Sequence, residues 1–151
     1  MELKLRHDFK GLVNSFERAP EVTKKMVHIQ LKMAVRDIRE RASEHHHYIS
    51  RSGMLEREGV ISQVADNKGI VELNPAVPYA AYVHEGTKPH LIIPKRCNVL
   101  RFVANGDYVF SKRVKHPGTQ KDQFLYNAAE HQLPEIQSRF EHALEELLKR
   151  V

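Results

Sequence analysis

The feature that most constrains the fold is a long stretch, Glu21 to about Glu44, in which apolar residues recur at helical spacing. A shorter helix over Asp8 to Arg18, with Asp8 as N-cap, is expected before it, and Pro20 suits the first turn of the long helix. The apolar stripe is broad, so we expect the long helix to lie across a sheet or between subunits. One stripe consists of Val22, Met26, Ile29 and Met33, and it is widened by Leu31, Ala34, Val35, Ile38 and Ala42.

After this helix the chain alternates short β-patterns with turn residues. The sequence Asp66-Asn67-Lys68-Gly69 predicts one hairpin turn, and the pair Asn105-Gly106 predicts another, because such residues accept the left-handed backbone of tight turns. Ser52-Gly53 marks a further turn, and Pro94 ends a short strand. The expected strands are Val60 to Ala65, Ile70 to Leu73, Leu91 to Ile93, Val99 to Val103 and Tyr108 to Ser111.

The chain is expected to close with helix. Tyr79 to His84 reads as one helical turn, Phe124 to His131 starts the closing helical region, and Pro134 suits the first turn of the last helix. Helices, then antiparallel hairpins, then a helix indicate the α+β class, and the length suits a single domain over residues 1–151. The apolar face of the last helix comprises Ile136, Phe140, Ala143, Leu144, Leu147 and Leu148.

The charge is unevenly distributed along the sequence. The chain carries a formal charge of +5, but residues 86–121 contain eight basic residues and one acid, Asp107. From Asp122 to Val151 acids outnumber bases. The basic surplus indicates an anionic partner, either nucleic acid or an acidic protein, with a solvated loop surface as the alternative. The basic residues are Lys88, Lys95, Arg96, Arg101, Lys112, Arg113, Lys115 and Lys121.

Composition disfavours several classes of protein. No apolar run approaches the roughly 18 residues of a membrane span. The charged segment Met1 to Lys10 has no apolar stretch behind it, so no signal peptide is expected. Cys97 is the one cysteine, which excludes an internal disulfide and suits a reducing compartment. We expect a soluble protein made and kept in a cytoplasm, with export by a dedicated route left open.

Ten histidines raise the question of metal binding or catalysis. His84-Glu85 begins like a zinc-protease helix, but the residue four positions after His84 is a lysine instead of the second histidine. Residues 45–47 are three consecutive histidines, which diverge by about 100° on a helix and suit a helix C-terminus when protonated. Cys97 or Ser111 with His116 lies in no recognisable nucleophile motif. We therefore expect no metal, no cofactor and no catalytic residue.

The tetrad His-x-Gly-Thr occurs twice, as His84-Glu85-Gly86-Thr87 and as His116-Pro117-Gly118-Thr119. Each copy ends a predicted regular element and opens a basic, proline-marked loop. Glycine allows a positive φ, and the threonine hydroxyl can cap a turn. A single tetrad is an ordinary turn, but two of them around a strand pair indicate loops built to present something.

With these motifs in view, the sequence resembles a family of minor structural proteins of long-tailed bacteriophages, the neck or tail-completion proteins. The resemblance covers roughly Leu12 to Leu148. Two departures are small: Ser52 replaces the family's usual threonine, and residues 120–123 are more polar than the family's proline-bearing stretch. The matching runs are Arg51 to Arg57; Tyr79 to His90 with Ile93-Pro94-Lys95; Leu100-Arg101-Phe102 with Val109-Phe110; and Val114 to Thr119 with Phe124-Leu125 and Ala128-Ala129.

The resemblance implies a fold, a role and a set of partners. The fold is a mainly antiparallel sheet packed against a long helix, with a C-terminal helix. The role is that of a non-enzymatic virion protein, assembled in the host cytoplasm, that completes the head-proximal end of the tail and helps join tail to head. The partners are further copies of the chain in a ring, a hexamer being favoured, and other neck and tail proteins. No catalytic residue is carried over, and no membrane is involved.

A ring needs head-to-tail contacts between two different faces of each subunit. The broad face of the long helix is one candidate, and the loops at His84–Pro94 and Lys115–Phe124 are the other. The basic segment either faces DNA passing through the channel or docks on an acidic ring. The expected partner-contacting residues are Tyr79, Tyr82, His84, Gly86, Thr87, Pro89, His116, Pro117, Gly118, Thr119 and Phe124. The expected basic contact residues are Lys88, Lys95, Arg96, Arg101, Lys112, Arg113 and Lys115.

Two other functions compete with this interpretation. The basic segment also suits a non-specific nucleic-acid-binding domain, although no known recognition motif is present. A small hydrolase or ribonuclease would have to use His84, Glu85 and His116. The sequence leaves open the ring size, the direction that the basic loops face, and the choice between tail completion, tail termination and head closure.

Overall fold

The computed structural model describes residues 4–5, 21–65 and 67–148, and its elements confirm the α+β class. The short helix expected over Asp8 to Arg18 and the role expected for Pro20 lie outside these residues. The elements in chain order are β1 (Lys4–Leu5), α2 (Glu21–Glu44), α3 (Met54–Glu58), β2 (Val60–Ala65), β3 (Lys68–Leu73), α4 (Tyr79–Glu85), β4 (His90–Ile92), β5 (Leu100–Ala104), β6 (Asp107–Ser111), β7 (Val114–His116) and α5 (Phe124–Leu148).

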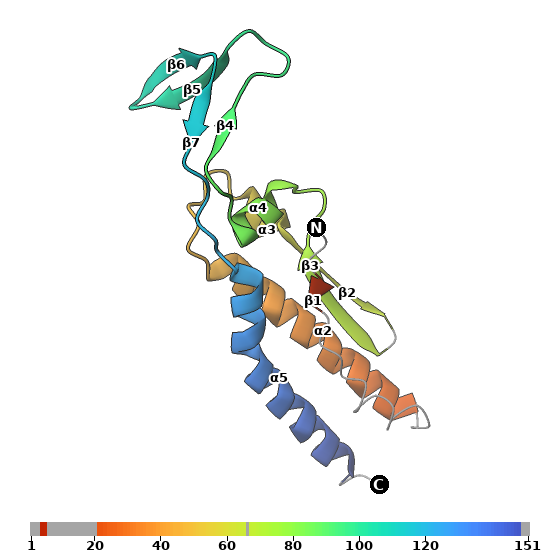
Figure 1. The fold of residues 1–151 in the computed structure, drawn as a ribbon. Helices are drawn as coiled ribbons and strands as arrows, with labels where there is room; N and C mark the ends of the chain where they lie inside the picture. The colour runs from red at the N-terminus through yellow and green to blue at the C-terminus, as the bar shows by residue number, and fades with distance from the viewer. Residues whose placement is uncertain (1–3, 6–20, 66, 149–151) are drawn as a thin grey trace.

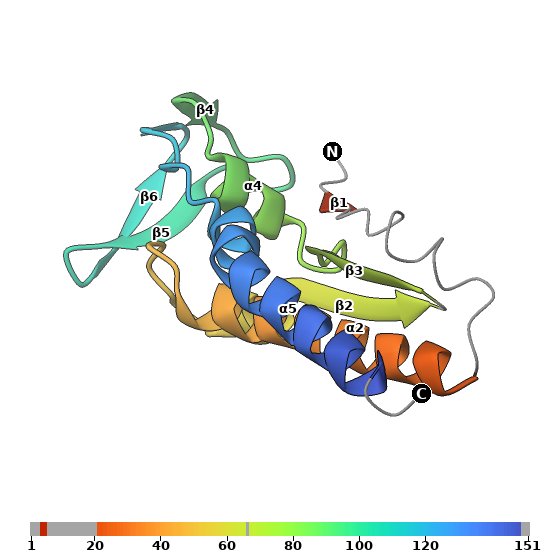
Figure 2. The same cartoon turned by 90° about the horizontal axis from the view of Figure 1, so that it is seen from below.

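The two long helices and the first hairpin form an elongated body. Figures 1 and 2 show α2 running alongside α5 on one side and along the β2–β3 hairpin on the other. The hairpin is antiparallel, with Val60 opposite Leu73 and Ala65 opposite Lys68, and β1 joins the free edge of β3. The predicted hairpin is thus confirmed, with a tighter turn than expected because β3 already begins at Lys68.

Among the described residues, the core of the body comprises two apolar clusters, both built on α2. Towards the start of α2, Val27, Leu31 and Ala34 pack with Ile136 and Phe140 of α5. Towards its end, α2 packs with the hairpin, α3, α4 and the beginning of α5. The buried members of this second cluster are Val35, Ala42, Leu55, Val60, Val71, Val77, Ala80, Phe124, Leu125 and Ala128.

The two sets of apolar residues that were expected to form one broad stripe of α2 lie on opposite sides of the helix, and the set around Val22 is not the buried one. Val22 and Ile29 are 63% and 54% exposed, whereas Leu31 is 1% exposed. At about 100° per residue, the stripe centred on Val22 and Ile29 lies on the opposite side of the helix from Leu31 and Ala42. The sheet and α5 both cover the second set of apolar residues. The helix therefore carries one buried apolar face and one exposed one.

Local structure differs from expectation at two further places. Gly53 has a φ of +66° and precedes the short helix α3, so the predicted turn is confirmed but the helix after it was not foreseen. Pro134 lies inside a single helix, α5, and not in the first turn of a separate one. Proline removes one backbone hydrogen bond, and Figure 1 shows α5 changing direction along its length. Packing on α2 from both sides of Pro134 keeps the helix continuous.

Residues 87–119 form an arm that projects from the end of the body (Figure 1). Its shaft is the antiparallel pair β4–β7, with His90 opposite His116 and Ile92 opposite Val114. Its distal part is the predicted β5–β6 hairpin, whose turn places Asn105 and Gly106 at φ values of +55° and +89°. Strand β7 and its pairing with β4 were not predicted. Within 87–119 no residue is buried.

Candidate functional site at the arm and its base

The two His-x-Gly-Thr tetrads meet at the base of the arm. The Thr87 N–H donates to the Thr119 carbonyl oxygen (2.9 Å), and the Thr119 N–H donates to the Thr87 carbonyl oxygen (3.1 Å) and lies 2.9 Å from the Thr87 hydroxyl. Segments 32 residues apart are thereby clamped together. The sequence indicated two separate loops, and the structure makes them the two legs of a single joint.

Glycine is required in both legs of this joint. Gly86 and Gly118 have φ values of +72° and +93°, in the region that side chains rarely adopt. A Cβ atom on Gly118 would collide with the Thr87 carbonyl oxygen, and one on Gly86 would lie 2.9 Å from the Thr119 carbonyl oxygen. The two legs approach each other so closely that only a backbone without side chains fits.

The tetrad histidines play different parts. His84 is fully buried and packs edge-on against the rings of Phe124 (5.3 Å) and Tyr126 (4.9 Å). Its Nδ1 lies 3.0 Å from Glu85 Oε1, and Glu85 Oε2 lies 3.3 Å from Lys121 Nζ. Burial lowers the pKa of His84, although Glu85 opposes that shift, so the imidazole is neutral near pH 7 and its Nδ1–H donates to Glu85.

His116, in contrast, stabilises its own turn. The Gly118 N–H donates to His116 Nδ1 (3.1 Å), and the ring lies 5.0 Å from that of His90 across the shaft. His84 is 0% exposed, so it has no surface with which to contact a substrate. This burial removes His84 from the hydrolase alternative that needed it beside Glu85 and His116.

Burial also corrects the expected set of partner contacts. His84 and Phe124 were expected to contact a partner, but they are 0% and 1% exposed and belong to the core. Tyr79 and Tyr82, on α4, are 40% and 62% exposed and remain accessible. Pro89 and Pro117 are exposed at the base of the arm, where Gly86, Thr87, Gly118 and Thr119 form the joint.

Asp122 is the residue of this region that the sequence analysis did not identify. Its carboxylate is 6% exposed and accepts backbone hydrogen bonds from His47 (2.6 Å) and Tyr48 (2.8 Å). The Asp122 N–H donates to the Val83 carbonyl oxygen (3.2 Å). One side chain thus ties the segment after α2 to the returning leg of the arm. The available signal was an acidic residue just before a helix, a position favoured for capping.

An open groove of about 1160 Å³ runs between the base of the arm and the segment that links α2 to α3. Tyr79, Val83 and Thr119 line one side, and Ile49 and Met54 line the other. Ile49 is 87% exposed. The groove gives the base of the arm an apolar, accessible surface.

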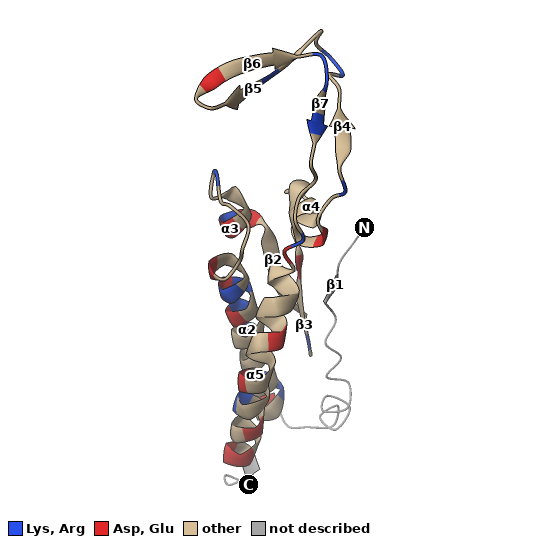
Figure 3. Ribbon diagram, turned by 60° about the vertical axis from the view of Figure 1, so that its left-hand side comes forward, with Lys and Arg blue, Asp and Glu red and all other residues tan. Residues whose placement is uncertain are grey.

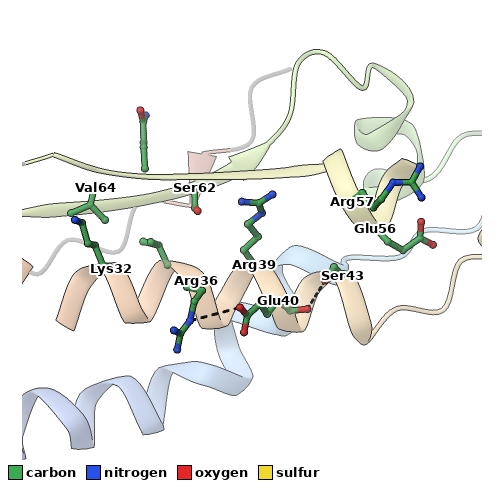
Figure 4. A pocket seen from close by; sticks show the side chains of 11 residues that line it. Lys32, Arg36, Arg39, Glu40, Ser43, Glu56, Arg57, Ser62 and Val64 are labelled. Atoms are coloured by element: carbon green, nitrogen blue, oxygen red, sulfur yellow. Dashed lines mark hydrogen bonds and ion pairs between the residues drawn. The ribbon is translucent and has the colours of Figure 1, made fainter. Parts of the chain in front are cut away.

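A second pocket of about 500 Å³ lies between α2 and β2 (Figure 4). Lys32 and Arg39 extend from α2 towards the strand, whereas Arg36 pairs with Asp37 (3.0 Å) and Glu40 (3.7 Å). The sequence analysis did not single out these residues. The pocket is cationic on one wall and offers no nucleophile paired with a base.

The arm exposes most of its large apolar side chains. Its distal hairpin has one face that carries Val103, Tyr108 and Phe110, which are 62%, 66% and 64% exposed. Arg101 lies on the same face, with its guanidinium 5.0 Å from the centre of the Tyr108 ring. Among the described residues, eight of the fourteen large apolar residues with high exposure belong to the arm: Leu91, Ile92, Ile93, Val99, Phe102, Val103, Tyr108 and Phe110.

The basic residues gather where the shaft meets the distal hairpin. Lys95 and Arg96 lie in the connection from β4 to β5, and Lys112 and Arg113 lie in the connection from β6 to β7. Because Ile92 pairs with Val114, both connections start at the same end of the shaft. We call these four exposed residues the basic knuckle. Lys88 lies at the base, Lys115 on the shaft and Arg101 on the hairpin, and in the described residues none of the seven forms an ion pair.

Within the described ranges, no group of three or more His, Cys, Asp or Glu side chains is arranged to hold a metal ion. No helix among the described residues has the length and apolar character to cross a membrane. Comparisons with protein-family models, with curated proteins and with solved structures found no match. The fold and site define a small α+β protein with a helical body and an exposed, basic and apolar β-arm.

Proposed function

We propose that the chain is a structural, non-enzymatic subunit of the neck of a tailed bacteriophage. In this role it completes the head-proximal end of the tail and helps join tail to head. It works as a homo-oligomeric ring, with a hexamer as the favoured size, in contact with other neck and tail proteins of the virion.

The observation that carries this proposal is the exposed arm. A two-stranded β-ribbon is marginally stable by itself in water, and this ribbon leaves Tyr108 and Phe110 more than half exposed. Contiguous apolar surface of that kind marks a site of protein contact. A subunit that assembles with its neighbours would bury this surface, whereas a solitary protein would leave it in water.

Two further surfaces support assembly in a ring. Ring formation requires head-to-tail contact between different faces of each copy. The exposed stripe of α2 around Val22 and Ile29 lies apart from the arm, and the groove beside Ile49 lies at the base of the arm. Each copy therefore offers several distinct, exposed apolar surfaces to its neighbours, as a head-to-tail contact requires.

The resemblance to neck proteins gains support from the joint. The two most specific matching runs, Tyr79 to His90 and Val114 to Thr119, are distant in sequence but lie side by side through the Thr87–Thr119 clamp. Their glycines and threonines are explained by the geometry of the arm. This accounts for the motif without any catalytic role.

A second candidate function is non-specific nucleic-acid binding, because the basic knuckle lacks acidic partners in the described residues. Phosphate contacts would make such binding steeply dependent on salt. In the neck, the same residues would face DNA in the channel.

Disruption of the gene in its phage tests the proposal. We expect lysates that contain filled heads and tails that are not joined, as seen by negative-stain electron microscopy. Complementation with the wild-type gene restores joined particles, and mass spectrometry finds the chain in them. Complete, infectious virions from the disrupted phage would refute the proposal.

A further inference from the structure

The outward face of α5 carries four exposed acids, Glu130, Glu135, Glu141 and Glu145. Within the described part of the chain, the carboxylates of these four form no ion pair and no hydrogen bond. The one arginine of the helix, Arg139, is turned inward and pairs with Asp37 of α2 (2.6 Å). The helix thus has no lysine and no outward-facing arginine of its own to neutralise these glutamates.

Helical geometry places these acids together. At about 100° per residue, Glu130 and Glu141 differ by roughly 20° around the axis, Glu145 lies about 60° from Glu130, and Glu135 lies about 140° from it, so the four acids span one broad side of the helix. Ile136 and Phe140, which are buried in the core, lie outside this span. We call Glu130, Glu135, Glu141 and Glu145 the acidic stripe; Figure 3 shows acidic bands along α5.

The basic knuckle is the electrostatic counterpart of this stripe. The arm as a whole carries seven basic residues and one acid, Asp107. Both surfaces are solvent-exposed: two connections at one end of the shaft form the knuckle, and the stripe lies along α5, so each offers several charges to the other. An opposite surface potential on two faces favours their association and fixes its direction.

A single copy cannot bring these two surfaces together. The arm rises from the end of the body where α5 begins, and the acidic stripe extends along α5 away from it (Figures 1 and 3). The Thr87–Thr119 clamp and the close approach at Gly118 hold the arm in this direction. Neutralisation of the charges therefore requires another molecule.

We propose that the basic knuckle of each copy docks on the acidic stripe of the neighbouring copy. This inference rests on the proposed ring and specifies which two faces form its head-to-tail contact. A contact between unlike faces propagates around a ring, as a heterologous interface must. The partner is a second copy of this chain, recognised by a row of carboxylates.

Two charge-reversal variants of the full chain test the contact. The first carries Lys95→Glu, Arg96→Glu, Lys112→Glu and Arg113→Glu; the second carries Glu130→Lys, Glu135→Lys, Glu141→Lys and Glu145→Lys. In each variant alone, like charges face each other across the contact. We expect a self-association constant at least about a hundred-fold weaker than that of the wild type, measured by sedimentation velocity.

The mixture of the two variants is the decisive sample. The acidic knuckle of the first variant matches the basic stripe of the second, and the unchanged surfaces match as well. We therefore expect an equimolar mixture to regain wild-type association, in assemblies that alternate the two. Circular dichroism of each variant checks that reversal leaves the fold intact, and the rescue by mixing cannot arise from misfolded chains.

Three outcomes would overturn the inference. One is wild-type association by either variant alone, and another is a mixture that stays dissociated. The third is a wild-type chain that remains monomeric throughout the concentration series. If the first variant keeps wild-type self-association and loses only its binding to a duplex DNA probe, the function of the basic knuckle is to bind nucleic acid. The gene-disruption experiment remains a separate test, because a neck subunit can assemble through other faces.

Discussion

Individual residues at the base of the arm fix its direction, and Asp122 is the one with the largest expected effect on the stability of the joint. Its carboxylate receives two short backbone hydrogen bonds from the segment after α2, at a site with almost no access to water. A buried donor that loses its acceptor keeps the full cost of desolvation. The stability of the joint should therefore depend on this single side chain.

Asp122→Ala should lower the free energy of unfolding by about 2–3 kcal/mol, because two part-buried N–H groups lose a charged acceptor that is itself buried. Asp122→Asn keeps one carbonyl oxygen in place and should cost less. Urea unfolding followed by circular dichroism measures both. Asp107→Ala, at the exposed start of β6 in the distal hairpin, is the matched control and should change little. Equal effects of Asp122→Ala and Asp107→Ala would contradict this account.

Gly118 and Gly106 separate the effect of a crowded site from that of backbone conformation. Both have a positive φ, but a Cβ on Gly118 would collide with Thr87, whereas one on Gly106 would meet nothing within 4 Å. Gly106→Ala should cost about 1 kcal/mol locally, and Gly118→Ala should also open the clamp. Hydrogen exchange of the Thr87 and Thr119 amides should accelerate in Gly118→Ala alone. Protected amides in that variant would argue against the clamp.

His84 should make stability sensitive to mildly acidic pH. Burial lowers its pKa below the ordinary value of 6.5, so the unfolded chain binds a proton more readily than the folded chain. The stabilisation is complete above pH 6.5 and is lost as the pH falls towards the folded-state pKa. The pKa of Glu85 is also lowered: burial would raise it, but hydrogen bonds from His84 and Lys121 outweigh burial. The stabilisation that comes from the lowered pKa of Glu85 is lost only when the pH falls below 4.5, the ordinary pKa of a glutamate.

His84→Leu should therefore flatten the slope of unfolding free energy against pH between about pH 6.5 and 4.5. The slope is obtained from urea unfolding at a series of pH values. His45→Gln, which changes an exposed histidine, should keep the wild-type slope. An unchanged slope in His84→Leu would show that other groups govern the acid sensitivity.

At the scale of elements, the sequence predicted what local patterns encode. Helical spacing gave the bounds of α2, and turn residues located the β2–β3 and β5–β6 hairpins. The pairing of β4 with β7 was missed, because it joins segments about 24 residues apart, each only three residues long. No local periodicity specifies such a pair. The repeated tetrads were the visible signal, but their closeness depends on the fold.

Two errors arose where packing overrides local preference. The apolar residues of α2 were read as one broad stripe, but the set around Val22 and the set around Leu31 lie on opposite sides of the helix, and the positions of the hairpin and α5 decide that the second set is buried. Pro134 was read as a helix start, yet contacts on both sides of it keep α5 intact. For the site, the tetrads and the basic surplus were found from the sequence. The burial of His84 and the role of Asp122 required the three-dimensional arrangement.

Replacement of residues 88–118 by an Asn-Gly turn should leave the body folded. Thr87 and Thr119 already form an antiparallel pair that a two-residue turn can close. The core lies outside the deleted range. The free energy of unfolding should stay within about 1 kcal/mol of the wild-type value. Loss of cooperative unfolding in urea would show instead that the arm stabilises the body.

At the scale of the whole molecule, stability is divided unequally between the body and the arm. The body buries two apolar clusters, whereas the arm relies on strand pairing with its side chains in water. Local opening is easiest where few apolar contacts are buried. A molecule of this kind should order its arm fully only when a partner covers it, so assembly and local stability are linked.

This linkage predicts that amide protection in the arm depends on protein concentration, whereas protection in the body does not. In dilute solution, the amides of β5 and β6 should exchange quickly, because little more than their own ladder protects them. As copies associate, contact with a neighbour should slow that exchange, while amides in the buried part of α2 near Leu31 stay equally slow throughout. Hydrogen exchange with mass spectrometry across a concentration series makes the comparison, and the knuckle-reversed variant is the control that should stay unprotected. Protection of the arm that is already complete in the monomer would mean that it needs no partner to be ordered.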